Sequence, residues 1–537
     1  MDSTMMHMPM TVQMIMEHGK NVFPNSCIST FGGSSIERTL YSEIASNAAK
    51  LATVLRNLGV EPGDTVGTFS WNNTAHMEAY LAIPSMGAIM HTANIRLSPE
   101  HIAYVINHAE DKVLILDGSL AELFRPVIPL LETVQTLLVI GEMPDYAGID
   151  CQPYEDLVDA AQETVEWPEI DETSAAAVCY TSGTTGNPKG VVYSHRTTFL
   201  HSMASRAADT FGICERDRIL LLPPMFHANA WGLPYSGWFS GSDFILPGPH
   251  LQVEPILAMV ASERPTMTAT VPTILSDLLR YDTSELDMTS FRMLVCGGSA
   301  VAPAMIDAAR EKWGVPVLQG WGMTETSPLC TLSHPPRDSE GRDETQWRAK
   351  SGRPVSGVQV RVVDDSGKVL PHDGESVGEL QLRGPWITGG YHNNESPDSF
   401  SEDGWLRTGD VGHIDERYYV QLTDRTKDVI KSGGEWISSV DLENILLAHP
   451  DVREIAVIAT PDERWQERPL AIVTREHNSA SAQDLRKYLR GKVAGFWVPE
   501  YWSFIDTIPK TSVGKLDKRT LRDWNEAGQL DVEVIAK

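Results

Sequence analysis

A glycine- and hydroxyl-rich segment directly after an apolar run constrains the fold of this chain more than any other feature. The apolar run, residues 175–179, has the character of a buried strand end. The segment after it is Tyr180-Thr181-Ser182-Gly183-Thr184-Thr185-Gly186-Asn187-Pro188-Lys189-Gly190. Glycines let backbone amides approach a polyanion, hydroxyls donate hydrogen bonds, and lysine adds a compact positive charge. The pattern predicts a phosphate-binding loop after a strand, with a flexible surface turn as the alternative. Its spacing differs from that of the Walker loop.

Three later segments place charged and aromatic side chains beside glycines. They are Gln319-Gly320-Trp321-Gly322-Met323-Thr324-Glu325-Thr326, Trp405-Leu406-Arg407-Thr408-Gly409-Asp410 and Ile508-Pro509-Lys510-Thr511-Ser512-Val513-Gly514-Lys515. A single carboxylate combined with phosphate oxygens suits Mg²⁺, which keeps most of its waters. The chain carries a formal charge of −28, so a nucleotide ligand needs a local basic site. The lysines and arginines around Lys515 supply one.

The same negative charge argues against nucleic acid and anionic lipid as partners. The six cysteines are scattered without a C-x-x-C pair, which indicates a reducing compartment. The methionine-rich residues 1–16 lack the basic start of a signal peptide, and no stretch is long enough to span a bilayer. We therefore expect a cytoplasmic protein without stable membrane insertion.

A chain of 537 residues is too long for one compact core, so at least two domains are expected. Short apolar runs at 113–116, 137–140 and 293–296 alternate with helical patterns, as in α/β layers. A hairpin pattern from 358, with a turn at 364–367, predicts a small β-barrel-like subdomain. After about residue 425 the periodicity indicates a compact α+β unit, with a helical spacing over Leu485, Tyr488, Leu489 and Val493. We expect an N-terminal α/β domain over 1–424 and a small C-terminal domain over 425–537.

In composition and order the four segments resemble the adenylate-forming (AMP-binding) superfamily. This superfamily includes acyl-CoA synthetases, luciferases and peptide-synthetase adenylation domains. The matching segments run from residue 180 to 515, and smaller resemblances continue upstream at 91–99. Trp231 and residues 433–443 bring the chain closest to the medium- and long-chain fatty acyl-CoA synthetases.

The resemblance implies a site for Mg²⁺, ATP and CoA. In the superfamily the glycine-rich loop holds the phosphates, an aromatic ring stacks on adenine, and a carboxylate binds the ribose. The residues that match these roles are Thr181, Ser182, Gly183, Thr184, Thr185, Lys189, Gly298, Gly320, Trp321, Gly322, Thr324, Asp410, Arg425, Gly433 and Gly434, with Glu325 as the metal ligand. The superfamily usually has tyrosine at the position of Trp321. Tryptophan preserves ring stacking on adenine, but it cannot make a contact that depends on a phenol.

The resemblance also implies three catalytic residues and a hinge. Lys515 matches the lysine that meets the carboxylate and the α-phosphate during adenylation. Lys431 would assist thioester formation, beside the loop of Gly433 and Gly434 that borders the pantetheine path; this double glycine is equally compatible with a structural turn. Lys427 matches the residue about which the small domain turns, which makes that domain mobile.

The acyl pocket is implied by the segment Pro223-Pro224-Met225-Phe226-His227-Ala228-Asn229-Ala230-Trp231. His227 is the candidate beside the substrate carboxylate. Trp231 resembles the indole that gates an acyl tunnel, and a buried core tryptophan is the alternative. Gly297 and Gly298 follow a predicted strand and precede a helix expected to begin near Pro303, so they are expected to line the floor of the adenine and acyl pockets.

Together these features predict an AMP-forming acyl-CoA synthetase, an acid–thiol ligase, that activates a medium- or long-chain fatty acid through acyl-AMP. The alternatives are a CoA ligase for a short, aryl or sulfur-containing acid such as methylthiopropionate, and a luciferase-like or carrier-protein adenylating enzyme. A nucleotide-binding regulator without catalysis is disfavoured by the set Lys189, Glu325, Asp410 and Lys515. By analogy, a homodimer through the N-terminal region is expected. The exact acid, the pathway and the oligomeric state stay open.

Overall fold

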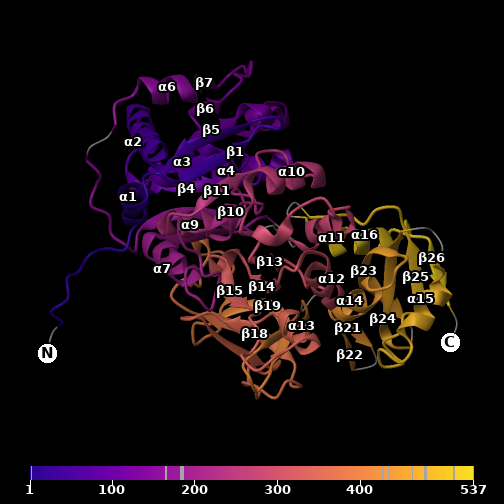
Figure 1. The fold of residues 1–537 in the computed structure, drawn as a ribbon. Helices are drawn as coiled ribbons and strands as arrows, with labels where there is room; N and C mark the ends of the chain where they lie inside the picture. The colour runs from indigo at the N-terminus through magenta and orange to yellow at the C-terminus, as the bar shows by residue number, and fades with distance from the viewer. Residues whose placement is uncertain are drawn as a thin grey trace.

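Two large sheets of mostly parallel strands account for the first two-thirds of the chain (Figure 1). The computed structural model describes residues 1, 3–163, 166–181, 187–425, 428–432, 435–462, 464–476, 480–511 and 514–535. Within these ranges the first sheet has seven strands, in the order β7 (Asp150–Pro153), β6 (Thr136–Ile140), β5 (Asp111–Asp117), β3 (Thr65–Phe69), β4 (Ile89–Thr92), β8 (Ala175–Tyr180) and β9 (Gly190–Ser194).

The second large sheet has nine strands in the described part of the chain. Their order is β16 (Arg353–Pro354), β15 (Leu329–Leu332), β14 (Val317–Gly322), β13 (Met293–Gly297), β12 (Met267–Thr270), β10 (Arg218–Leu220), β11 (Asp243–Leu246), β1 (Cys27–Phe31) and β2 (Ile36–Leu40). The apolar runs at 113–116, 137–140, 175–179 and 293–296 form β5, β6, β8 and β13, so the predicted α/β layering is confirmed. These strands are almost entirely buried, because helices cover both faces of a parallel sheet.

Helices fill the space between the two sheets and cover their outer faces. The inner layer consists of α1 (Val12–Val22), α2 (Tyr41–Asn57), α3 (Thr74–Ser85), α7 (His195–Ser205) and α9 (Leu233–Ser240). The outer faces carry α4 (Pro99–His108) and α5 (Ala121–Phe124) on one sheet, and α10 (Val253–Glu263), α11 (Pro272–Arg280) and α12 (Pro303–Trp313) on the other. The remaining short helices are α6 (Tyr154–Ala160), α8 (Ala228–Trp231) and α13 (Arg342–Arg348).

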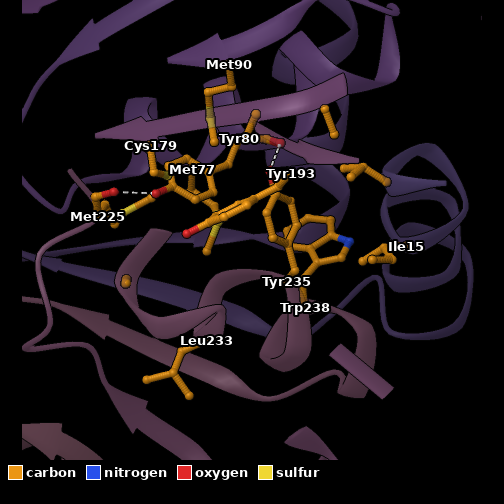
Figure 2. Packing of buried hydrophobic residues seen from close by; sticks show 14 of the residues in the cluster. Ile15, Met77, Tyr80, Met90, Cys179, Tyr193, Met225, Leu233, Tyr235 and Trp238 are labelled. Carbon is orange, nitrogen blue, oxygen red and sulfur yellow. Dashed lines mark hydrogen bonds between the residues drawn. The ribbon is translucent and has the colours of Figure 1, made fainter. Parts of the chain in front are cut away.

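The largest core lies in this inner helical layer and includes residues of both sheets. The rings of Tyr41 and Trp238 stack there with centroids 3.9 Å apart. Figure 2 shows Trp238 of α9 beside Tyr235 and Ile15, so helices from distant parts of the sequence meet at this point. The first helix, α1, is thus an integral part of the core.

Local sequence explains where the helices begin and end. Asn73 and Ser98 accept from the backbone at the starts of α3 and α4. Pro303 opens α12, as the sequence predicts, and Gly314 ends it at φ 71°. Because β8, β13 and β14 run into glycine-rich loops at their carboxyl ends, these loops gather at one edge of the sheets, where α/β folds bind ligands.

The predicted small β unit is a four-stranded antiparallel sheet. It runs β17 (Gln359–Val363), β18 (Gly378–Arg383), β19 (Leu406–Ile414) and β20 (Val420–Arg425). The predicted turn at 364–367 joins β17 to Val369, which bridges back to Val363. Since β20 ends at Arg425, the proposed boundary at Asp424 falls one residue before the end of this sheet.

The C-terminal unit lies beside α11 and α12 (Figure 1). Its sheet, as far as the structure describes it, comprises β21 (Ile430–Ser432), β22 (Glu435–Ile437), β23 (Val452–Asp462), β24 (Gln466–Arg475), β25 (Tyr501–Phe504) and β26 (Val532–Val534). The helices α14 (Ser439–Leu447) and α15 (Ala482–Leu489) pack on one face, and α16 (Lys518–Glu526) packs on the other. The predicted helical spacing through Val493 extends too far, because α15 ends at Leu489.

The N-terminal residues divide into an exposed arm and a buried helix. Met1, Met5, Met6 and Met8 are exposed, and the arm leads away from the body (Figure 1). From Val12 onward the chain is in α1, whose apolar face is buried within the same chain. A partner-binding role predicted for residues 1–16 is therefore restricted to the arm before α1. None of the described helices is long and apolar enough to cross a bilayer.

Candidate active site

A cavity of about 1060 Å³ lies at the carboxyl ends of the strands and brings most of the predicted residues together. The predicted residues that line it are Thr181, Lys189, His227, Trp231, Gly297, Gly298, Gly320, Trp321, Gly322, Thr324, Glu325, Arg425 and Lys515. A second cavity of about 570 Å³ lies between α11 and the C-terminal unit. It shares Gly298, Trp321, Arg425 and Lys515 with the first and adds Asp410.

The other predicted residues either lie outside the described part of the chain or line neither cavity. Ser182, Gly183, Thr184, Thr185, Lys427, Gly433 and Gly434 lie outside the described residues. Lys431 is exposed on β21, where its backbone N–H donates to Glu467 at 2.7 Å. The structure does not bring Lys431 into either cavity lining.

The two described ends of the glycine-rich loop close on each other. The N–H of Thr181 donates to the carbonyl of Lys189 at 3.0 Å, and the N–H of Lys189 donates to Thr181 Oγ1 at 3.1 Å. Lys189 Nζ lies 5.1 Å from the centre of the Tyr391 ring. The Tyr391 hydroxyl in turn donates to Glu325 at 2.7 Å. Tyr391 therefore lies between Lys189, the predicted phosphate-binding lysine, and Glu325, the predicted metal ligand.

Glu325 is well placed to share a divalent cation with phosphate oxygens. Its side chain is 7% exposed but lines the larger cavity, and burial raises the pKa of its carboxyl. One of its oxygens accepts from Tyr391, which leaves acceptor capacity on the other. No cluster of three or more metal-ligating side chains occurs among the residues that the structure describes. One carboxylate beside a phosphate site fits Mg²⁺, which is commonly bound through one or two carboxylates plus substrate phosphates.

Asp410 is held from two sides by aromatic and basic groups. The indole Nε1–H of Trp321 donates to its Oδ2 at 2.9 Å, and Arg425 Nε lies 3.2 Å from its Oδ1. Asp410 and Arg425 face each other in the register of β19 and β20. A carboxylate has about four acceptor positions, so both oxygens can still accept from sugar hydroxyls. Trp321, which stands where the sequence comparison leads us to expect tyrosine, thus makes a polar contact with Asp410 through its indole N–H.

Lys515 reaches the cavity from the C-terminal unit. Its loop is fixed by Thr511, whose Oγ1 accepts from the Lys515 N–H at 3.2 Å, and by Thr273 of α11, whose hydroxyl donates to the Gly514 carbonyl at 3.5 Å. The side chain passes over Gly298, where an added Cβ would lie 3.0 Å from Lys515 Cε. Burial, reinforced by Arg425, lowers the Lys515 pKa from 10.5 to about 8.

His227 is a neutral imidazole in this setting. Burial lowers its pKa to about 3, and the positive charges of Lys515 and Arg96 add to that effect. It can therefore offer an N–H or a lone pair to a substrate carboxylate, but not a positive charge. The positive charges near that position come from Lys515 and Arg96.

Trp231 forms a wall of the cavity, is partly buried and also packs against the main core. Its indole fits against Gly297, where an added Cβ would lie 3.2 Å from Trp231 Cη2. Residues 228–231 all have left-handed backbone angles, with φ between 44° and 60°. For residues with a Cβ, this conformation costs about 1–2 kcal/mol each.

Comparisons with known proteins agree with this geometry. Residues 18–392 match the family model described as AMP-binding enzyme, and residues 441–515 match its C-terminal domain. The chain belongs to the AMP-binding enzyme family. The predicted superfamily is therefore confirmed.

Two curated relatives of this family match nearly end to end. The long-chain-fatty-acid–CoA ligase of Thermus thermophilus is 42% identical over 97% of this chain and 96% of its own length. The 3-methylmercaptopropionyl-CoA ligase of Ruegeria pomeroyi is 40% identical over 97% of this chain and 98% of its own. The crystal structure of the anthranilate CoA ligase AuaEII with anthranoyl-AMP superimposes with a TM-score of 0.88 at 26% identity. It covers 98% of this chain and 100% of that one.

Tyr391 and Arg96 are among the cavity residues that the sequence did not indicate. Tyr391, which joins Lys189 to Glu325, follows two glycines that indicate only a turn. Arg96 lines the same cavity, and it lies in the segment 91–99 whose resemblance to the superfamily carried no assigned role. In both cases the tertiary fold, rather than sequence spacing, brings the residue to the site.

Proposed function

We propose that this chain is an AMP-forming acyl-CoA synthetase that activates a medium- or long-chain fatty acid. The observation that carries the proposal is Lys515. This lysine comes from the C-terminal unit yet lies in one cavity with the ends of the phosphate loop, Glu325 and Arg425. A carboxylate oxygen attacks the α-phosphorus of ATP and pyrophosphate leaves, which gives acyl-AMP. The CoA thiol then attacks the acyl carbon, AMP leaves, and the thiol proton passes to solvent.

In the first step Lys515 would supply the positive charge at the reacting centre. Negative charge concentrates between the attacking carboxylate and the phosphoryl oxygens as the new bond forms, and a fixed ammonium group stabilises that state. Lys189 would hold the phosphates of the leaving pyrophosphate. Trp321 and Asp410 would hold the nucleoside, by ring stacking and by accepting from the ribose hydroxyls.

Mg²⁺ is part of this proposal. Glu325 would hold it together with the phosphates of ATP, and when bound it would neutralise charge that develops on those phosphates. Tyr391 orients the carboxylate of Glu325 by donating to one of its oxygens.

In the second step the C-terminal unit would turn about Lys427. That movement would withdraw Lys515 and bring Lys431 and the glycines at 433 and 434 toward the acyl-adenylate, with CoA entering beside them. The exposed position of Lys431 on β21 fits this order of events, because the residue would have no role in adenylation.

A sulfur-containing short acid is the second candidate substrate. The specific support is the 40% identity to a 3-methylmercaptopropionyl-CoA ligase, which is close to the 42% identity to a long-chain enzyme. The two substrate classes would differ in how their acyl groups contact Trp231, which is partly exposed and forms a wall of the cavity.

The assay that tests the proposal is CoA ligation dependent on ATP and Mg²⁺, across straight-chain, aryl and sulfur-containing acids. We expect the highest kcat/KM with medium or long straight chains. A maximum with methylthiopropionate would replace the substrate but keep the mechanism. Adenylation without CoA ligation would contradict the function itself.

A homodimer formed through the exposed methionine arm, and a cytoplasmic location, stay part of the proposal. The arm before α1 exposes Met1, Met5, Met6 and Met8 to solvent. Sedimentation of the protein with and without residues 1–9 would test the arm. A monomer in both cases would contradict the dimer.

A further inference from the structure

Four consecutive residues beside the acyl wall adopt a backbone conformation that side chains disfavour. The φ angles are 44° at Ala228, 50° at Asn229, 48° at Ala230 and 60° at Trp231, and Gly232 continues at 71°. Four of these five residues carry a Cβ, which clashes with the backbone in the left-handed region. Such a run persists only where surrounding contacts enforce it, and such strain is found mainly at functional sites.

Within this run the side chain of Asn229 is buried and accepts hydrogen bonds from distant parts of the chain. Its Oδ1 accepts from Cys179 Sγ at 3.2 Å and from Thr92 Oγ1 at 3.5 Å. The hydroxyl of Tyr80 lies 3.3 Å from the same oxygen, but it lies only 2.5 Å from the carbonyl of Met225. Because a phenol has one proton, Tyr80 donates to Met225, and the two lone pairs of Asn229 Oδ1 remain for Cys179 and Thr92.

The groups around the Asn229 side chain come from three different elements. Tyr80 lies on α3, Thr92 ends β4, and Cys179 lies on β8 two residues before Thr181 of the phosphate loop. Figure 2 shows Tyr80, Cys179 and Met225 together at this edge of the core, with the bond between Tyr80 and Met225 dashed. Burial raises the pKa of Cys179 to about 12, so its sulfur keeps the proton that it donates.

We propose that Asn229 is a positioning residue that sets the acyl-chain preference by holding the left-handed turn and, through it, Trp231. The turn places the indole of Trp231 closely against Gly297. A Cβ added at Gly297 would lie only 3.2 Å from Trp231 Cη2. A turn that relaxed to ordinary backbone angles would move the indole and change the depth of the acyl pocket. This inference rests on the proposed function.

The test uses variants of the two donors, Cys179 and Thr92, and of the acceptor, Asn229. Some variants remove the hydrogen-bonding group, and matched controls keep it. Cys179→Ala removes one donor, and Cys179→Ser is its matched control because it keeps a donor of similar size. Thr92→Val removes the other donor without changing the shape. Asn229→Leu removes the acceptor, whereas Asn229→Asp keeps an acceptor oxygen. For each variant, kcat/KM is measured over straight-chain acids from acetate to palmitate, together with KM for ATP and the thermal midpoint.

We expect Asn229→Leu to change the ratio of kcat/KM for long over short acids by about tenfold or more, the size of effect that pocket methylenes have. Thr92→Val and Cys179→Ala should change it in the same direction by less. Cys179→Ser and Asn229→Asp should keep the wild-type order of acids, and KM for ATP should stay within about twofold in the donor variants, because ATP contacts are not altered.

An equal loss for every acid, with the chain-length order unchanged, would show a merely structural role and overturn the inference. Should Asn229→Leu fail to fold, the donor variants decide the question in the same way. Failure of the wild-type protein to ligate any acid would overturn the proposed function, and this inference with it. A normal wild-type profile with unshifted variants would overturn the inference alone.

Discussion

At the scale of single residues, two side chains have properties that their neighbours determine. Lys515 has a pKa lowered to about 8 by burial and by Arg425, although an ordinary lysine stays charged well above that pH. Trp321 donates to Asp410 as well as presenting a ring to the cavity. Each property predicts a measurable behaviour of the adenylation step.

The first prediction concerns pH. Adenylation needs the charged form of Lys515, which is present below its pKa and is lost as pH rises through about 8. Pyrophosphate release without CoA should therefore show, in kcat/KM for ATP, a falling limb centred near pH 8. Arginine stays charged throughout this range, so Lys515→Arg should be slower, by about a hundredfold, but without that limb. A limb that survives in Lys515→Arg would assign the titration to another group.

The second prediction concerns the ribose. Trp321→Phe keeps an aromatic ring but removes the N–H that fixes Asp410, and a hydrogen bond to a charged group contributes about 1.5–3 kcal/mol. We expect kcat/KM for ATP to fall about tenfold or more. With 2′- or 3′-deoxy-ATP the loss should be smaller, because Asp410 then has fewer hydroxyls to accept from. The KM of the acid serves as the control, and an equal loss with all three nucleotides would contradict the role of the indole.

At the scale of elements, the first helix is a structural part of the N-terminal domain. Gly19 of α1 lies against Trp238 of α9, where an added Cβ would lie 2.2 Å from Nε1, and the same nitrogen donates to the Met16 carbonyl at 3.1 Å. This close approach is why a glycine occupies the middle of α1, although glycine weakens helices.

The third prediction follows from that contact. Gly19→Ala should reduce the free energy of unfolding by about 1–3 kcal/mol through overpacking, despite the higher helix propensity of alanine. Urea unfolding measures the change. Gly495→Ala, at a position with open space, is the matched control and should be close to neutral. A stabilised Gly19→Ala protein would mean that α1 is not packed as described.

The elements that could be predicted are those whose signal is local. Residues 113–116 and 293–296 are continuous apolar runs, and they became buried parallel strands. The end of α15 was misplaced, because Val493 continues the helical spacing although the chain has already turned at Arg490. The left-handed turn at 228–231 could not be predicted from its sequence, since the side chain of its Asn229 accepts from residues on β4 and β8 that are distant in the sequence.

At the scale of the whole molecule, the site depends on how two units meet. Separate sequence motifs identify Lys515 and Glu325 as site residues. Residue spacing does not predict that Tyr391 lies between Glu325 and Lys189. It also does not predict that the side chain of Lys515 passes over Gly298. The C-terminal unit contacts α11 through Arg280, which lies 2.9 Å from Glu476 and donates to the Arg453 carbonyl at 3.0 Å. Both partners of that ion pair are partly exposed, so this pair contributes little to stability.

The measurement that tests the central claim most directly is the comparison of the two half-reactions in Lys515→Ala. The account predicts that pyrophosphate release from ATP and acid falls by at least about a hundredfold, because the charge at the reacting centre is lost. It also predicts that conversion of supplied acyl-AMP and CoA to acyl-CoA stays within a few-fold of the wild-type rate. An equal loss in both half-reactions would contradict the proposal that Lys515 serves adenylation alone and leaves the site before the thioester forms.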